Sequence, residues 1–224
     1  MYYTAFSIHN IIMERPSYPF TPMLLGSASL PFDDKNYAFE VKYDGVRILS
    51  RIAESAVLYN RRLNARTRQY PEIAAQLKEL CSKAGAGAAT VLDGEIIALS
   101  AEGAPDFYRV MKRDRVAEPA QRFIKENPAY YMVFDVTELN GAALYAAPYA
   151  LRREKLEALF KGLKTPLPNI KLVDSVTGGG TALFMAAEGE GLEGIVAKRL
   201  DSVYKANVRS HDWLKIKIKN YTRP

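Results

Sequence analysis

Residues 40–47 read Glu-Val-Lys-Tyr-Asp-Gly-Val-Arg, and the interpretation of the whole chain depends on this stretch. An apolar run precedes the Asp44-Gly45 pair, and a second strand-like run, Val46–Ile52, follows it. Asp-Gly between two such runs is a strong signal for a two-residue β-hairpin. The pattern therefore predicts paired strands over 37–42 and 46–52, with Lys42 on a rigid strand end just before the turn.

Lys42 is a candidate nucleophile because of this position. A free lysine amine is protonated and unreactive at neutral pH. Desolvation and neighbouring cations lower its pKa enough for the amine to attack phosphorus or carbonyl carbon. Most lysines before hairpins face water, so a solvated Lys42 is the alternative that this segment alone leaves open.

The overall composition is that of an ordinary globular protein. The chain has 224 residues, of which 48% are hydrophobic and 25% are charged, and this length suits one large domain or two small ones. No apolar run approaches the roughly eighteen residues that a membrane span requires. Residues 1–10 lack the basic and then apolar pattern of a secretory signal. We therefore expect a protein of the cytoplasm that has no membrane partner.

Cysteine and histidine are too scarce to carry the chemistry. Cys81 is the only cysteine, and His9 and His211 are the only histidines. An internal disulfide and a cysteine zinc cluster are excluded, and a histidine metal cage or Ser-His-Asp chemistry has little support. The net charge of +6 is compatible with a polyanionic partner, and equally with a merely basic surface.

The rest of the chain mixes short strands with helices and lacks strict alternation. Residues 1–36, which contain four prolines, are expected to form an irregular arm. Strands are predicted at 56–59, 130–136, 171–176, 194–198 and 213–218. Residues 90–99 are predicted to form either one long strand or a strand, a turn and a second strand. Helices are predicted at 71–84, 106–116, 151–163 and 181–187. This mixture favours an α+β fold with mainly antiparallel β-sheets flanked by helices.

Several segments place charged or aromatic groups on or beside these strands. Arg61 follows a strand and presents a cation, although a solvated turn is the plainer interpretation. Glu95 lies between apolar residues, where a carboxylate must be partnered or functional because burying it unpaired is costly. Phe134 ends an apolar strand, and it is either a core residue or a ring that stacks on a base.

The last two segments combine acidic and basic groups on strands. Glu193 and Lys198 lie at opposite ends of one predicted strand, and a carboxylate such as Glu193 suits Mg²⁺. Lys215 and Lys217 alternate with apolar residues, so they share one strand face. Two lysines on one face repel each other unless an anion such as a phosphate lies between them. An amphipathic surface strand is the alternative.

In their order, these segments resemble the motifs of the covalent nucleotidyltransferases, the superfamily of ATP-dependent DNA ligases, RNA ligases and mRNA capping enzymes. The resemblance covers about 22–217 and rests on six motifs: Lys42-Tyr43-Asp44-Gly45, the Arg61 segment, Asp93-Gly94-Glu95, Phe134-Asp135, Glu193-Gly194-Ile195-Val196 and Lys215-Ile216-Lys217. Residues 193–199 and 213–217 look most like the ligase module of bacterial non-homologous end-joining DNA ligases. The resemblance implies that 1–224 is an adenylation domain.

The resemblance implies roles at the phosphate end of a bound ATP. Lys42 would attack the α-phosphate, release pyrophosphate and become lysyl-AMP. Lys215 and Lys217 would bind the α-phosphate and stabilise charge as pyrophosphate leaves. Glu193 would position Mg²⁺ or Mn²⁺, and Lys198 would add to the field around the phosphates.

It also implies how the nucleoside is held. Glu40, through its side chain or its backbone, would help to read adenine. Phe134 would stack on one face of the base, and Val196 would cover the other. Arg47 and Glu95 would hold the ribose.

At two motifs the resemblance is incomplete: one departs from the family pattern, and the other contains a residue without an assigned role. Arg61 would lie near the sugar or a phosphate, but Asn60 stands before it where many DNA ligases have serine or threonine. Asp44 belongs to its motif without an assigned role. No C-terminal OB-fold domain, which family ligases use in the ATP step, is expected within 1–224. Self-adenylation and nick sealing are therefore expected to be weak unless such a domain comes from elsewhere.

The implied substrate is nicked or broken double-stranded DNA, bound by a monomer in a bacterial or archaeal cytoplasm or nucleoid, with end-joining partners supplied elsewhere. AMP would pass to a DNA 5′-phosphate, and the 3′-hydroxyl would displace it. An RNA ligase and a capping-type guanylyltransferase are alternatives, although capping enzymes tend to have aspartate at the position of Glu193. A non-catalytic module that binds a DNA end or a partner is the third possibility.

Overall fold

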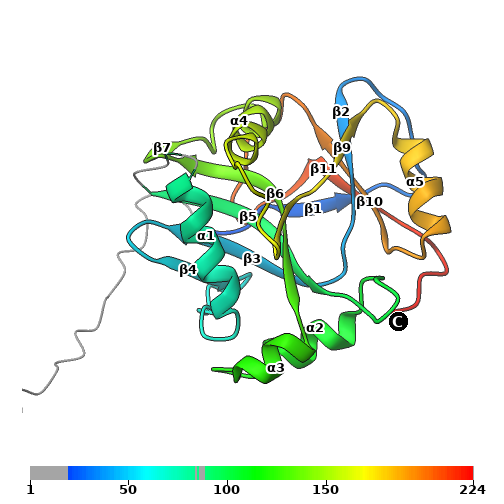
Figure 1. The fold of residues 1–224 in the computed structure, drawn as a ribbon. Coiled ribbons are helices and arrows are strands. Elements are labelled where there is room, and N and C mark those ends of the chain that lie inside the picture. The colour runs from blue at the N-terminus through cyan, green and yellow to red at the C-terminus, as the bar shows by residue number, and fades with distance from the viewer. Residues whose placement is uncertain (1–19, 84, 86–88, 224) are drawn as a thin grey trace, which may run out of the picture.

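The protein contains two β-sheets that face each other, as seen in the computed structural model, which describes residues 20–83, 85 and 89–223 (Figure 1). The first sheet has the order β1 (Leu24–Ser27), β11 (Arg209–Lys217), β10 (Gly194–Arg199), β2 (Tyr37–Val41) and β9 (Ser175–Thr177). The second has the order β4 (Ala56–Asn60), β3 (Val46–Ile52), β5 (Thr90–Ala98), β6 (Ala129–Leu139) and β7 (Ala142–Ala143), and β8 (Ile170–Leu172) also pairs with β6.

Helices cover the outer faces of both sheets. They are α1 (Pro71–Lys83), α2 (Phe107–Asp114), α3 (Gln121–Glu126), α4 (Tyr149–Lys161) and α5 (Gly180–Gly189). Helix α5 packs on β2 and β10, whereas α1 and α4 pack on the second sheet. Among the named strands, the described pairs are antiparallel except β1 with β11 and β6 with β8. The predicted α+β fold with mainly antiparallel sheets is therefore confirmed.

The alternation of side chains along the strands decides which residues face the space between the sheets. In β10 and β11, Ile195, Ala197 and Ile216 pack towards α5 in one apolar core. Successive strand residues point to opposite faces, so Lys198 and Lys215 point away from that core. The pairing register places Val196 beside Glu40 on one side and beside Lys215 on the other. Polar groups from three strands therefore meet between the sheets.

The predicted hairpin over 37–42 and 46–52 is wrong. Strand β2 pairs with β10 and β9, while β3 pairs with β4 and β5, so residues 42–45 cross from one sheet to the other. Gly45 makes this crossing close to β5, where an added Cβ would lie 2.2 Å from the carbonyl oxygen of Ile96. The backbone N–H of Lys42 donates to the carbonyl of Gly194 at 2.9 Å. Lys42 therefore lies at the junction of the two sheets.

The predicted irregular arm over 1–36 is also partly wrong. Residues 1–19 lie outside the described part of the chain, but Leu24–Ser27 forms strand β1. This strand pairs in parallel with β11, at the edge of the first sheet, where flanking prolines do not interrupt a ladder. The single strand predicted at 171–176 is two strands, β8 and β9, which belong to different sheets.

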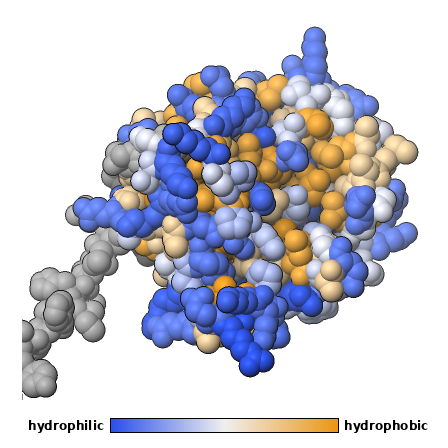
Figure 2. Space-filling view, viewed as in Figure 1, coloured by the Kyte–Doolittle hydropathy of each residue, from blue (hydrophilic) through white to orange (hydrophobic). Residues whose placement is uncertain are grey.

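The other predicted elements are confirmed with small shifts at their ends, although residue 84 of the first predicted helix is not described. Asp106 caps α2 as predicted, and it accepts a hydrogen bond from the backbone N–H of Arg109 at 2.9 Å. Helix α3 was not predicted, since none of its six residues is buried and it has no apolar face. Figure 2 shows hydrophilic side chains over this end of the molecule, where α2 and α3 lie. Within the described residues, no helix combines the length and the apolar character needed to span a bilayer.

Candidate active site

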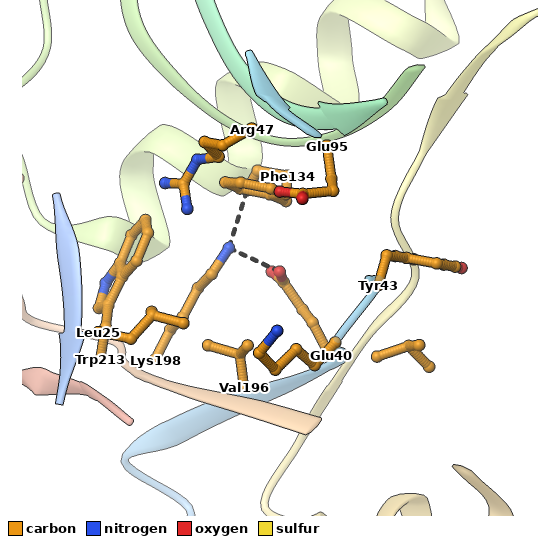
Figure 3. Close-up of a pocket in the computed structure, with 11 residues that line it drawn as sticks. Leu25, Glu40, Tyr43, Arg47, Glu95, Phe134, Val196, Lys198 and Trp213 are labelled. Carbon is orange, nitrogen blue, oxygen red and sulfur yellow. Dashed lines mark hydrogen bonds and ion pairs between the residues drawn. The ribbon is translucent and has the colours of Figure 1, made fainter. Parts of the chain in front are cut away.

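Two adjoining cavities lie between the sheets. The smaller of the two, named the enclosed cavity here because it is the more closed one, is lined by Leu25, Glu40, Val41, Lys42, Tyr43, Arg47, Glu95, Phe134, Val196, Lys198 and Trp213 (Figure 3). The open cavity is lined by Pro22, Met23, Leu24, Leu25, Lys42, Asp44, Arg47, Arg61, Glu193, Arg209, Lys215, Lys217 and Arg223. Lys42 and Arg47 line both.

The enclosed cavity has an aromatic wall and an aliphatic wall. Phe134 and Val196 lie on opposite sides of it, and Lys198 and Glu40 point towards each other between them (Figure 3). Nζ of Lys198 lies 2.6 Å from Oε2 of Glu40, and both side chains are almost fully buried. Burial lowers the pKa of Lys198, and Glu40 opposes that shift. The hydroxyl of Tyr149 donates a hydrogen bond to the other oxygen of Glu40.

Arg47 is held against the aromatic wall by a buried carboxylate. Its Nε and Nη2 donate to the two oxygens of Asp93 at 2.6 and 2.7 Å. The guanidinium carbon lies 4.5 Å from the ring centroid of Phe134. A bidentate pair of this kind fixes orientation as well as charge. Tyr204 also donates to Asp93, at 2.6 Å, so this carboxylate is fully engaged.

Glu95 points into the enclosed cavity, and no hydrogen bond satisfies its carboxylate among the described contacts (Figure 3). Burial raises the pKa of Glu95 to about 7, although Arg47 and Lys42 oppose the shift. A carboxyl group whose pKa is raised on folding binds its proton at a higher pH in the folded state than in the unfolded chain. Stability is therefore lost as the pH rises from the ordinary carboxyl range through 7.

Glu95→Gln is expected to reverse this loss. At pH 8 its free energy of unfolding should exceed that of the wild type by about 2–3 kcal/mol, because no buried charge remains. The difference should shrink steadily as the pH falls towards 5, where the wild-type carboxyl is protonated in the folded state. Urea unfolding of both proteins between pH 5 and 8 measures this. A difference that grows as the pH falls would contradict the assignment.

The open cavity gathers cations around one carboxylate. Glu193 binds Lys42 through one oxygen and Lys217 through the other, the latter at 2.6 Å. Burial lowers the pKa of Lys215, and Lys217, Arg209 and Lys42 lower it further by repulsion. An anion entering this cavity would relieve the repulsion among these side chains, as predicted for Lys215 and Lys217.

Asp44 is covered by the segment that follows β11. Its carboxylate accepts hydrogen bonds from Nε of Arg223 at 2.6 Å and from the hydroxyl of Tyr221 at 3.3 Å. The guanidinium carbon of Arg223 lies 3.9 Å from the ring centroid of Phe107. In Figure 1 this red segment runs from β11 towards the start of α2. The segment thus adds Arg223 to the lining of the open cavity, a contact that no local pattern in the sequence signals.

The structure places every predicted site residue on one of the two cavities. Arg61 lies on the rim, where it is exposed. Lys198 lies elsewhere than predicted: it lines the enclosed cavity with Glu40 and is absent from the open, cationic one. Its place follows from the register, because Lys198 pairs with Ala38 while Gly194 pairs with Lys217. The two ends of β10 therefore serve different cavities.

Sequence analysis missed several side chains that complete the site. They are Asp93, Tyr149, Tyr204, Arg209, Trp213 and Arg223. Asp93 lies two residues before Glu95, so strand alternation could have placed it on the same face. The others owe their positions to contacts between segments far apart in the chain.

Comparisons with known proteins identify the family of the chain. The family profile of the ATP dependent DNA ligase domain matches residues 22–217. The SPbeta prophage-derived DNA ligase-like protein LigB of Bacillus subtilis is 39% identical over 203 residues, which cover 90% of this chain and 68% of LigB. The multifunctional non-homologous end joining protein LigD of Mycolicibacterium smegmatis is 33% identical over 204 residues, which cover 90% of this chain and 24% of LigD.

A solved structure supports the same family. The structure of mycobacterial DNA ligase D complexed with ATP and MES superposes with a TM-score of 0.72 at 28% sequence identity. The match covers 88% of this chain and 60% of that one. The chain thus spans about a quarter of the M. smegmatis LigD and three fifths of the solved chain.

Proposed function

The chain belongs to the ATP-dependent DNA ligase domain family, and we propose that it acts as the adenylation domain of such a ligase, with Lys42 as the residue that becomes lysyl-AMP. The observation that carries the proposal is the position of Lys42. It is the lysine that lines both the enclosed cavity and the open cavity among the described residues. A nucleotide whose base enters the first and whose phosphates enter the second would present its α-phosphate at this junction.

The chemistry of each cavity suits one part of ATP. We propose that a planar base binds in this cavity, with the ring of Phe134 on one side and the side chain of Val196 on the other, and with charged groups beside it that can fix its orientation. Arg47 and Glu95 line the same cavity, and in this proposal they would bind the ribose. Lys215 and Lys217 line the open cavity, and charge-assisted contacts to phosphate are stronger than neutral ones.

Glu193 suits a divalent metal. Mg²⁺ keeps several of its waters and needs only one or two protein carboxylates together with substrate phosphates. Among the described residues, no three acidic, histidine or cysteine side chains form a group that could hold a metal ion. These residues therefore do not supply a complete set of protein ligands for a metal. Glu193 and Asp44 are the carboxylates that line the open cavity. A Mg²⁺ or Mn²⁺ ion held there would neutralise phosphate charge.

The attack exchanges one bond for another. After Lys42 has lost a proton, its Nζ forms a bond to the α-phosphorus, the bond from phosphorus to the bridging oxygen breaks, and pyrophosphate leaves with the electron pair. The excess proton on the new N–P nitrogen then passes to solvent. Lys215 and Lys217 stabilise the charge that develops, which is the kind of preorganised electrostatics on which phosphoryl-type transfer depends. AMP would then pass to a DNA 5′-phosphate, and a 3′-hydroxyl would displace it.

The DNA steps follow from the family and from the relatives. We propose nicked or broken double-stranded DNA as the substrate and, from the end-joining name of LigD, a role in break repair. An OB-fold domain and end-joining partners would be supplied outside these residues. The cationic rim, which includes Arg61 and Arg209, suits a phosphate backbone, so DNA binding should weaken with salt.

Mass spectrometry of the intact protein tests the proposal. We expect incubation with ATP, Mg²⁺ and inorganic pyrophosphatase to add one AMP, since removal of pyrophosphate makes the step irreversible. Added pyrophosphate without pyrophosphatase should remove the adduct. An adduct from GTP and none from ATP would favour a capping-type guanylyltransferase. No adduct from either nucleotide, when an OB-fold domain is also supplied, would favour a non-catalytic DNA-binding module.

A further inference from the structure

Two buried tyrosines lie behind the wall of the enclosed cavity. Tyr149, at the start of α4, and Tyr204, between β10 and β11, both pack edge-on against Trp213. The ring centroids are 6.0 and 5.8 Å from that of Trp213, at interplanar angles of 81° and 88°. Trp213 lines the cavity, but neither tyrosine does. The tyrosines therefore form a second layer that a nucleotide in the cavity would not touch.

The hydroxyl of each tyrosine donates a hydrogen bond to a carboxylate, and that carboxylate forms an ion pair with a basic side chain that lines the cavity. The hydroxyl of Tyr149 donates to Oε1 of Glu40, whose Oε2 lies 2.6 Å from Nζ of Lys198. Burial and the charge of Glu40 raise the pKa of Tyr149, so its hydroxyl stays protonated and remains a donor.

The second chain of contacts has the same form. The hydroxyl of Tyr204 donates to Oδ2 of Asp93 at 2.6 Å, and Asp93 binds Arg47 through both oxygens. The same hydroxyl accepts a hydrogen bond from the backbone N–H of Met23 at 3.0 Å, which leaves its own proton for Asp93. The side chain of Asp93 is fully buried, so an unsatisfied oxygen there would be costly.

The two chains of contacts converge on one ring. Nζ of Lys198 lies 4.4 Å from the centroid of Phe134, and the guanidinium carbon of Arg47 lies 4.5 Å from it. Lysine and arginine side chains have many rotamers, so each needs a fixed partner to remain in one place. Here the partners are Glu40 and Asp93, which the tyrosine hydroxyls hold.

We propose that Tyr149 and Tyr204 are positioning residues for nucleotide binding: their hydroxyls fix Glu40 and Asp93, which set Lys198 and Arg47 against Phe134. This inference rests on the proposed function, since it assigns the enclosed cavity to the nucleoside. It adds two residues that do not touch the ligand. Partners of this outer kind commonly matter nearly as much as the groups they orient.

Tyrosine-to-phenylalanine variants test the inference, because they remove one oxygen and keep the ring. Trp213 is the only tryptophan of the chain and lines the cavity, so its fluorescence reports nucleotide binding without any reaction. We expect Tyr149→Phe and Tyr204→Phe each to weaken ATP binding about three- to tenfold in a fluorescence titration without divalent metal. The KM for ATP in lysyl-AMP formation should rise by a similar factor, while kcat changes less than about twofold.

Tyr70→Phe is the matched control. Tyr70 is fully buried and donates to a carboxylate, Asp114, at 3.1 Å, but it belongs to the core beneath the second sheet. Its replacement should lower the melting temperature as much as the other two replacements do, and leave the Kd and KM for ATP unchanged. A merely structural role for Tyr149 and Tyr204 predicts the same behaviour in all three variants.

The outcomes separate this inference from the proposed function. Unchanged Kd and KM in both variants, with lysyl-AMP still formed, would overturn the inference and leave the proposed function intact. A fall in kcat at constant KM would also overturn it, because the hydroxyls would then not act through binding. Absence of both binding and lysyl-AMP in the wild type would overturn both. The two tyrosines are tested separately, so one folded variant is sufficient.

Discussion

Lys42→Ala is expected to abolish the AMP adduct, lowering its rate of formation by at least about 10³-fold, because the amine that would bond to phosphorus is gone. Lys215 and Lys217 line only the open cavity and Lys198 only the enclosed one, so Lys42 is the one of these four lysines that lies at the junction of the two cavities. The measurement is intact mass after incubation with ATP and Mg²⁺. Peptide mapping of the wild-type adduct should place AMP on Lys42.

Two controls make the result specific. Lys78→Ala changes an exposed lysine on α1, far from both cavities, and should leave the adduct unchanged. ATP should still alter the fluorescence of Trp213 in Lys42→Ala, which would show an intact cavity. The wild-type adduct should be released by acid and survive alkali, as a phosphoramidate does and an acyl phosphate does not. Persistence of the adduct in Lys42→Ala would show that another side chain is the nucleophile.

Strand alternation in the sequence was sufficient to predict one part of the site, the shared face of Lys215 and Lys217. Lys215 and Lys217 share a face because the residues between and beside them are apolar, and the register then brings Glu193 and Lys42 to them. The alternation of side chains along a strand is a local pattern, so it can be recognised in the sequence without knowledge of the fold.

Strand pairing could not be predicted in the same way. Asp44-Gly45 carries a strong hairpin signal, but β2 gains two neighbours, β10 and β9, from residues more than 130 positions further along the chain. Such pairings depend on long-range packing, which a two-residue turn signal does not contain. The partner of Lys198 was missed for the same reason, since Glu40 lies on β2.

The contacts of Asp44 and those of the two tyrosines could not be predicted from the sequence, for two different reasons. Asp44 belongs to a recognisable motif, yet its partners, Tyr221 and Arg223, are polar residues beyond the last strand. In the sequence, Tyr149 and Tyr204 resemble ordinary core aromatics, because a buried tyrosine can either pack in the core or position another residue through its hydroxyl. Only the atoms that they contact distinguish a positioning residue from packing.

Glu193→Gln is expected to slow lysyl-AMP formation by about 10²- to 10³-fold. Glu193 is almost fully buried and binds Lys42 and Lys217 at once, so a neutral amide leaves both lysines without their counter-charge. It also removes the carboxylate proposed to hold the divalent ion. Because both losses act on the phosphates, binding of adenosine nucleoside to the enclosed cavity should remain within about twofold of wild type by Trp213 fluorescence.

Glu188→Gln, on the exposed surface of α5, is the control and should be neutral in rate and in binding. A titration with Mn²⁺ or Mg²⁺ separates the two functions of Glu193. If the residue only recruits the metal, a high metal concentration should restore the rate. We expect partial recovery at most, because the position of Lys42 is lost as well and excess metal cannot replace that contact. A Glu193→Gln variant with a wild-type rate at ordinary metal concentration would remove Glu193 from the reaction.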